Sequence, residues 1–143
     1  MSWRIGSSRG PTMTLTSSSE GQKSIQKKSI LHICKREVLR PLRDEILRLS
    51  GFAVESTCNY GQGLSSFRER PYDLVLVDVE GEDGVHEAEL LCSEIKTSNH
   101  AQLVAFVCNW RVAILTDCPD VILRTEFDPT AFVVGVRETF TKH

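Results

Sequence analysis

Short apolar runs and helical repeats alternate along the chain from about residue 28 onward. Unbroken runs of aliphatic residues without polar alternation are typical of strands buried on both faces, as in a parallel sheet covered by helices. Five such segments, separated by helical patterns, predict a parallel sheet built from right-handed βαβ crossovers. The expected strands lie at 29–34, 53–57, 73–78, 103–108 and 121–124.

The same pattern predicts four helices. The first, Val38–Ser50, ends before Gly51, a residue suited to a helix C-terminus. Its apolar residues recur at helical spacing, whereas its arginines are expected on the outer, solvated face; the apolar set is Leu39, Leu42, Ile46 and Leu49, and the arginines are Arg40, Arg43 and Arg48. The other helices are expected at 61–70, at about 86–96 and after Asp128–Pro129, an N-cap and first-turn pair. The segment 109–120 holds at most a short helix.

This order of elements predicts a flavodoxin-like fold, a three-layer α/β sandwich with strands in the order 2-1-3-4-5. The order brings the ends of strands one, three and four together around Asp78, the last residue of the third strand. Open α/β sheets place their chemistry at the carboxyl ends of such strands, so Asp78 is the first candidate for a functional residue. The alternative is that Asp78 merely caps the following turn, because Asp suits turns.

Composition narrows the function classes. The 143 residues fit one domain, in which 28–143 form the folded part and 1–27, rich in Ser, Thr and Gly, form a disordered tail. A net charge of -2 argues against a nucleic-acid partner, and no apolar run is long enough to span a membrane. Five cysteines without a signal peptide or metal-ligand spacing indicate reduced thiols in a cytoplasmic protein. Nothing here indicates an enzyme.

Several stretches resemble the receiver domain of two-component response regulators, which has the CheY-like form of this fold. The resemblance runs from about residue 28 to 140, and its best parts are Ile30–Ile33, Leu49–Phe52, Arg68–Asp78 and Phe127–Pro129. In that family the aspartate ending the third strand accepts a phosphoryl group from a sensor histidine kinase. The resemblance therefore implies a stand-alone phosphorelay receiver, with Asp78 as phosphoacceptor and a kinase or other signalling protein as partner. With no room for a DNA-binding domain, output is expected to pass through another protein.

The residues around Asp78 depart from the family pattern. Cys34 and Lys35 stand where the family has the acidic pair that holds Mg²⁺ with the acceptor aspartate. A thiol and an ammonium supply none of the hard oxygen ligands that Mg²⁺ prefers, so the sequence disfavours Mg²⁺ and supports no cofactor with confidence. If Mg²⁺ were bound, its protein ligands would be Asp78 and the backbone carbonyl of Glu80. In a site without metal, Lys35 is expected to serve as a fixed counter-ion of Asp78, with Glu80 as a second acidic neighbour. The alternative is that Lys35 is a solvated lysine at a strand end.

The other strand ends are altered too. Cys108, or Val107 in a register shifted by one, takes the place of the family's Thr or Ser, and Thr125 falls where its Lys belongs, with Arg124 beside it as a substitute cation. The alternative function is therefore a pseudo-receiver, a constitutive protein-interaction module that never takes phosphate. Thiol chemistry between Cys34 and Cys108 is not expected, because two strand spacings put their Cα atoms about 9–10 Å apart.

Overall fold

The structure is a computed structural model that describes residues 26–114, 116–124 and 128–142. Of the disordered tail predicted for residues 1–27, positions 1–25 lie outside the described residues. Within the described part, no helix is both long and apolar enough to cross a membrane.

The described strands form one parallel sheet in the order β2-β1-β3-β4-β5, which confirms the predicted flavodoxin-like topology. β3 and β4 are buried along their whole length, as their unbroken aliphatic sequences predict. The strands are β1 Ser29–Ile33, β2 Ala53–Thr57, β3 Leu74–Asp78, β4 Val104–Cys108 and β5 Val121–Arg124.

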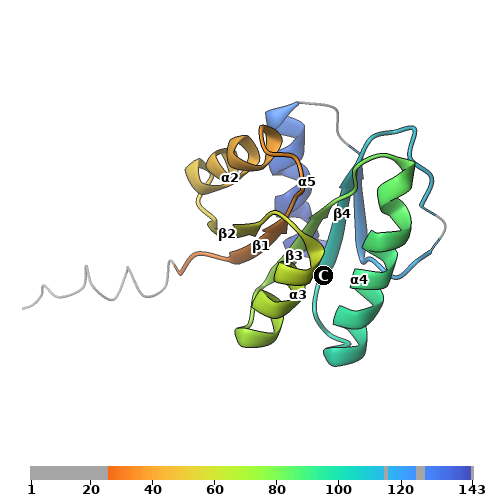
Figure 1. The fold of residues 1–143 in the computed structure, drawn as a ribbon. Coiled ribbons are helices and arrows are strands. Elements are labelled where there is room, and N and C mark those ends of the chain that lie inside the picture. The colour runs from red at the N-terminus through yellow and green to blue at the C-terminus, as the bar shows by residue number, and fades with distance from the viewer. Residues whose placement is uncertain (1–25, 115, 125–127, 143) are drawn as a thin grey trace, which may run out of the picture.

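Helices cover both faces of this sheet, as Figure 1 shows. α2 and α5 pack together on one face, and α3 and α4 pack together on the other. A single turn of 3₁₀ helix leads into α4. The bounds are α2 Leu39–Leu49, α3 Tyr60–Glu69, the 3₁₀ turn Glu82–Gly84, α4 Val85–Ser98 and α5 Pro129–Lys142.

Two predicted helix boundaries have the expected local chemistry. Gly51 adopts φ 101°, a left-handed conformation that favours glycine, and Phe52 N donates to Leu47 O at 3.1 Å to close α2. Asp128 Oδ1 accepts hydrogen bonds from the backbone amides of Thr130 and Ala131, at 3.0 and 3.2 Å, and so caps the start of α5.

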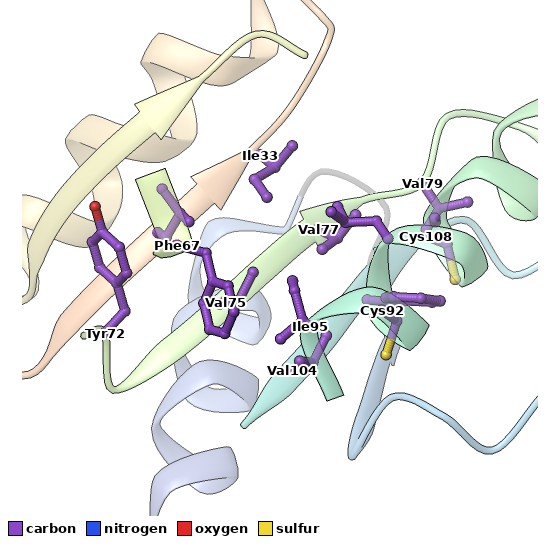
Figure 2. Packing of buried hydrophobic residues seen from close by; sticks show 14 of the residues in the cluster. Ile33, Phe67, Tyr72, Val75, Val77, Val79, Cys92, Ile95, Val104 and Cys108 are labelled. Atoms are coloured by element: carbon purple, nitrogen blue, oxygen red, sulfur yellow. The ribbon is translucent and has the colours of Figure 1, made fainter. Parts of the chain in front are cut away.

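The apolar core is divided into two layers by the sheet. Figure 2 shows the larger cluster, in which Ile33, Val77 and Cys108 point from the strands toward α3 and α4. The smaller cluster lies between the sheet and α2 with α5, and includes Leu47, Leu76 and Phe132. Because side chains alternate along a strand, β1, β3, β4 and β5 contribute to both layers.

The buried face of α2 differs from the one that its apolar spacing suggested. Leu42 and Leu49 are 56% and 79% exposed, whereas Arg43, Asp44 and Leu47 are buried. The helix is rotated because two of its charged side chains have buried polar partners on the sheet, described below. The expectation that Arg43 lies on a solvated outer face is therefore wrong.

The connection between β4 and β5 contains no helix among its described residues, in line with the short segment expected there. Arg124, at the end of β5, binds the backbone of this connection. Its Nη1 donates to the backbone carbonyls of Asn109 and Val112 at 2.9 and 2.7 Å.

Candidate functional site

Asp78 lies at the carboxyl end of the central strand and is only 3% exposed. Its Oδ2 accepts a hydrogen bond and ion pair from Arg43 Nη1 of α2, which is itself 8% exposed. The guanidinium carbon also lies 5.2 Å from the ring centroid of Phe132 of α5. Arg43 thus joins the sheet to both helices on this face, and the side chains of His32, Cys34, Arg43 and Asp78 are called the Asp78 pocket below.

Cys34 is the second side chain that contacts the Asp78 carboxylate. It follows β1, is fully buried, and its Sγ donates to Asp78 Oδ2 at 3.5 Å. Burial, reinforced by the negative charge of Asp78, raises the pKa of the Cys34 thiol to about 12. Cys34 is therefore a neutral thiol at physiological pH, and the structure places it beside Asp78.

A hydrogen-bonded chain of side chains runs from the pocket toward β2. The imidazole Nδ1 of His32 lies 2.8 Å from Asp44 Oδ1, and Ser56 Oγ donates to Asp44 Oδ2 at 2.6 Å. Burial acts to raise the pKa of Asp44, but the hydrogen bonds from His32 and Ser56 outweigh it and hold that pKa below its usual value. His32 is fully buried, and its Nε2 has no hydrogen-bond partner among the described residues.

Lys35 does not take the place proposed for it from the sequence. Its Nζ lies 2.5 Å from Glu87 Oε1 of α4 and 4.8 Å from the ring centroid of Tyr60 of α3, on the opposite side of the sheet from Arg43. The counter-ion of Asp78 is Arg43 instead. Tyr60 contacts Asp78 only through the backbone, because its hydroxyl donates to the backbone carbonyl of Asp78 at 3.2 Å.

Glu80, expected as an acidic neighbour of Asp78, also turns away. It is exposed, and its carboxylate lies 3.7 Å from Arg36 Nε at the surface. The carboxylate of Glu80 therefore adds no ligand to the Asp78 pocket.

Among the described residues, neither Cys108 nor Arg124 makes a hydrogen bond or ion pair with the Asp78 carboxylate. Val107 is the register partner of Asp78, and the side chain of Cys108 belongs to the cluster on the α3 and α4 face. Arg124 binds the carbonyls of the β4–β5 connection, as described above. Thr125 lies outside the described residues.

The residues present do not fit Mg²⁺. The ion prefers several hard oxygen ligands, but one Asp78 oxygen is already shared by a guanidinium and a thiol, and no second carboxylate of the described residues contacts Asp78.

Sequence reasoning missed two residues of the site, Arg43 and Asp44. A signal for Asp44 was present: a histidine in a strand covered on both faces needs a polar partner, and the helix that follows a strand packs back over it. Arg43 has no comparable signal, because an arginine on a surface helix is usually solvated.

A central parallel sheet in this order, with a carboxylate ending its third strand, is the architecture of CheY-like receiver domains. No protein-family model matches the sequence, and no curated protein matches it significantly. Among solved structures, the chain is similar to a CheY-like receiver domain from Methanospirillum hungatei, with TM-score 0.69 and 17% identity over 82% of this chain and 96% of that one.

A second similar structure is the response regulator TrrA of Thermotoga maritima in complex with Mg²⁺ and BeF, with TM-score 0.67 and 20% identity over 78% of this chain and 98% of that one. TrrA in complex with the histidine kinase ThkA matches with TM-score 0.66 and 20% identity, over 78% of this chain and 97% of that one. At these identities the similarity establishes that the chain has the CheY-like receiver fold.

Proposed function

We propose that this protein is a receiver-like signalling module, not an enzyme, that acts by binding another signalling protein. In this proposal Asp78 is one half of a structural ion pair and does not undergo Mg²⁺-dependent phosphorylation. The observation that carries the proposal is the buried contact between Arg43 and Asp78. This is the pseudo-receiver alternative of the sequence analysis, with Arg43 in the role assigned there to Lys35.

The physical reason lies in what phosphoryl transfer to a carboxylate requires. The reaction crowds negative charge, so catalysis depends on positioned cations and on an accessible nucleophile. Asp78 is almost fully buried, and its neighbouring thiol and guanidinium leave no set of oxygen ligands for Mg²⁺. The pocket is thus organised to stabilise a charge that is already present.

The proposed partner class is a sensor histidine kinase or another signalling protein. The complex of TrrA with ThkA supports this class, because TrrA has the same fold. Exposed apolar side chains of α2 and α5, among them Leu42, Leu49 and Val134, also give this face a surface of the kind that protein partners use. A cytoplasmic location and the lack of a nucleic-acid partner belong to the same proposal, supported by five free cysteines and a net charge of -2.

A second candidate function keeps Asp78 as a phosphoacceptor. Its support is the position of Asp78 at the end of β3 in a receiver fold, and the presence of a guanidinium, which binds phosphoryl oxygens well. In this mechanism Arg43 would leave the carboxylate and contact the incoming phosphoryl group, and no metal would be needed.

Incubation with acetyl phosphate or phosphoramidate, with and without Mg²⁺, separates the two candidates. Intact-mass measurement is made on the wild type and on Asp78→Asn, with TrrA as a positive control for the reagents. The pseudo-receiver predicts no added phosphoryl mass in either form of this chain. A phosphoryl adduct on the wild type that is absent from Asp78→Asn would overturn it, and an adduct that forms without Mg²⁺ would support the Arg43 mechanism.

A further inference from the structure

Three buried side chains of different chemistry converge in the Asp78 pocket. His32, Cys34 and Asp78 each offer one ligand atom, and these atoms lie within 4.8 Å of one another. All three residues come from neighbouring strands: β1 supplies His32 and leads into Cys34, and β3 ends in Asp78. Their burial distinguishes this set from the exposed acidic clusters that occur on most protein surfaces.

An imidazole nitrogen of His32, unpaired within the described part of the chain, is consistent with a ligand-binding role for the pocket. His32 Nε2 is buried and has no hydrogen-bond partner among the described residues, although such groups usually find one. Its other nitrogen, Nδ1, contacts the Asp44 carboxylate, which is in turn held by Ser56. A carboxylate on one imidazole nitrogen is the usual way in which proteins orient a histidine whose other nitrogen binds a metal.

We propose that the Asp78 pocket binds a transition-metal ion of the Zn²⁺ type through His32 Nε2, Cys34 Sγ and a carboxylate oxygen of Asp78. Imidazole, thiolate and carboxylate form a mixed N, S and O set that suits Zn²⁺ and Co²⁺ and disfavours Mg²⁺. With metal–ligand bonds of about 2.0–2.3 Å, tetrahedral ligand atoms lie roughly 3.3–3.8 Å apart. The observed 4.8 Å limit exceeds that geometry by about 1.0–1.5 Å, so the three side chains close by about that amount when the ion binds.

Metal binding exchanges groups in a balanced way. The Cys34 thiol loses its proton to solvent and becomes a thiolate ligand, and Asp78 exchanges the Arg43 guanidinium for the metal. The dipositive ion is then neutralised by one thiolate and one carboxylate. The fourth position of a three-ligand site is left to water.

A neighbouring cleft can accommodate the displaced Arg43 guanidinium. A cleft of about 60 Å³ beside the pocket is lined by Arg43, Asp128 and Phe132, and Asp128 supplies a carboxylate there. In this arrangement metal binding moves the Arg43 guanidinium into the cleft between α2 and α5. The metal site and a phosphoryl group would both use the Asp78 carboxylate, but Co²⁺ binding to the unmodified protein and the added phosphoryl mass are measured separately, so either test can fail without the other.

The test is titration of the untagged, metal-stripped full chain with Co²⁺, followed by competition with Zn²⁺ and Mg²⁺. We expect one bound Co²⁺ with tetrahedral d–d bands and a thiolate-to-cobalt charge-transfer band, displaced by Zn²⁺ and not by Mg²⁺. Cys34→Ser should abolish the charge-transfer band. Asp44→Asn, which alters the group that orients His32, should weaken Co²⁺ binding by about 10–100-fold.

Cys92→Ser is the matched control, because Cys92 is also fully buried but lies on the other face of the sheet, in the cluster of Figure 2. Its charge-transfer band should equal that of the wild type. X-ray absorption of the Zn²⁺-loaded wild type, which needs no variant, should show one sulfur among nitrogen and oxygen ligands. The proposal is overturned by the absence of a charge-transfer band in the wild type, by a band that survives Cys34→Ser, or by a shell of two sulfurs.

Discussion

Replacing Arg43 with alanine tests whether the Arg43–Asp78 pair is part of the folded structure. Arg43 is 8% exposed and Asp78 3%, so the substitution leaves a carboxylate away from water with only the Cys34 thiol as a side-chain donor among the described residues. Removing one member of a buried pair costs about 3–5 kcal/mol, chiefly because the other charge stays uncompensated. Since a domain of this kind is stabilised by about 5–15 kcal/mol, the variant should lose a large fraction of its stability.

Urea denaturation followed by circular dichroism measures this loss against a control on the same helix. Arg48 is exposed and its Nη2 donates to the backbone carbonyl of Val54 at 3.0 Å, so Arg48→Ala should cost no more than about 1 kcal/mol. Replacing both charges, as Arg43→Met with Asp78→Leu, should recover most of the stability that Arg43→Ala loses. The reasoning is refuted if Arg43→Ala and Arg48→Ala cost the same, or if the double variant costs the sum of its two single changes.

Two further predictions concern packing and titration. A Cβ on Gly63 would lie 2.5 Å from Ile33 Cδ1, so Gly63→Ala should destabilise the protein by about 1–3 kcal/mol, whereas Gly61→Ala in the same helix has room and should be neutral or stabilising in the same urea assay; equal effects would contradict this. Burial raises the pKa of both Tyr60 and Tyr72. The pKa of Tyr72 rises to about 12. Because the unfolded value is about 10, their contribution to stability is complete below pH 10 and is lost as the pH rises toward about 12. Ultraviolet titration should show tyrosinate near pH 10 in urea but not in the native protein, and native ionisation near pH 10 would be contrary to the structure.

The fold could be predicted from the sequence because its signals are local and redundant. Runs such as Leu74–Val77 specify buried strands without knowledge of their neighbours, and Gly51 and Asp128 mark helix ends by their own backbone chemistry. Right-handed crossovers then leave few topologies for five strands alternating with helices. Each of these inferences uses residues close together in the chain.

The site could be predicted only in part, because its contacts join residues far apart in sequence. Asp78 and Cys34 were found as strand-end residues, which topology places together. The orientation of α2 was not found, since the spacing of Leu42 and Leu49 favoured burying a face that the structure leaves exposed. A helix takes the rotation that satisfies the whole interface, and here the sheet beneath it already carries buried polar groups that need partners.

The different positions of Lys35 and Arg43 follow from the same interface. Successive residues of an extended chain point to opposite faces, so Cys34 and Lys35 cannot both turn toward Asp78 at the end of β1. The thiol takes the face of Asp78, and the ammonium takes the face of α3 and α4, where Glu87 receives it. A cation for Asp78 must then come from the helices that cover its own face, α2 and α5, and α2 supplies it as Arg43. The buried carboxylate at the end of β3 and the buried face of α2 are therefore one feature, because the charge of Asp78 requires Arg43 to point inward.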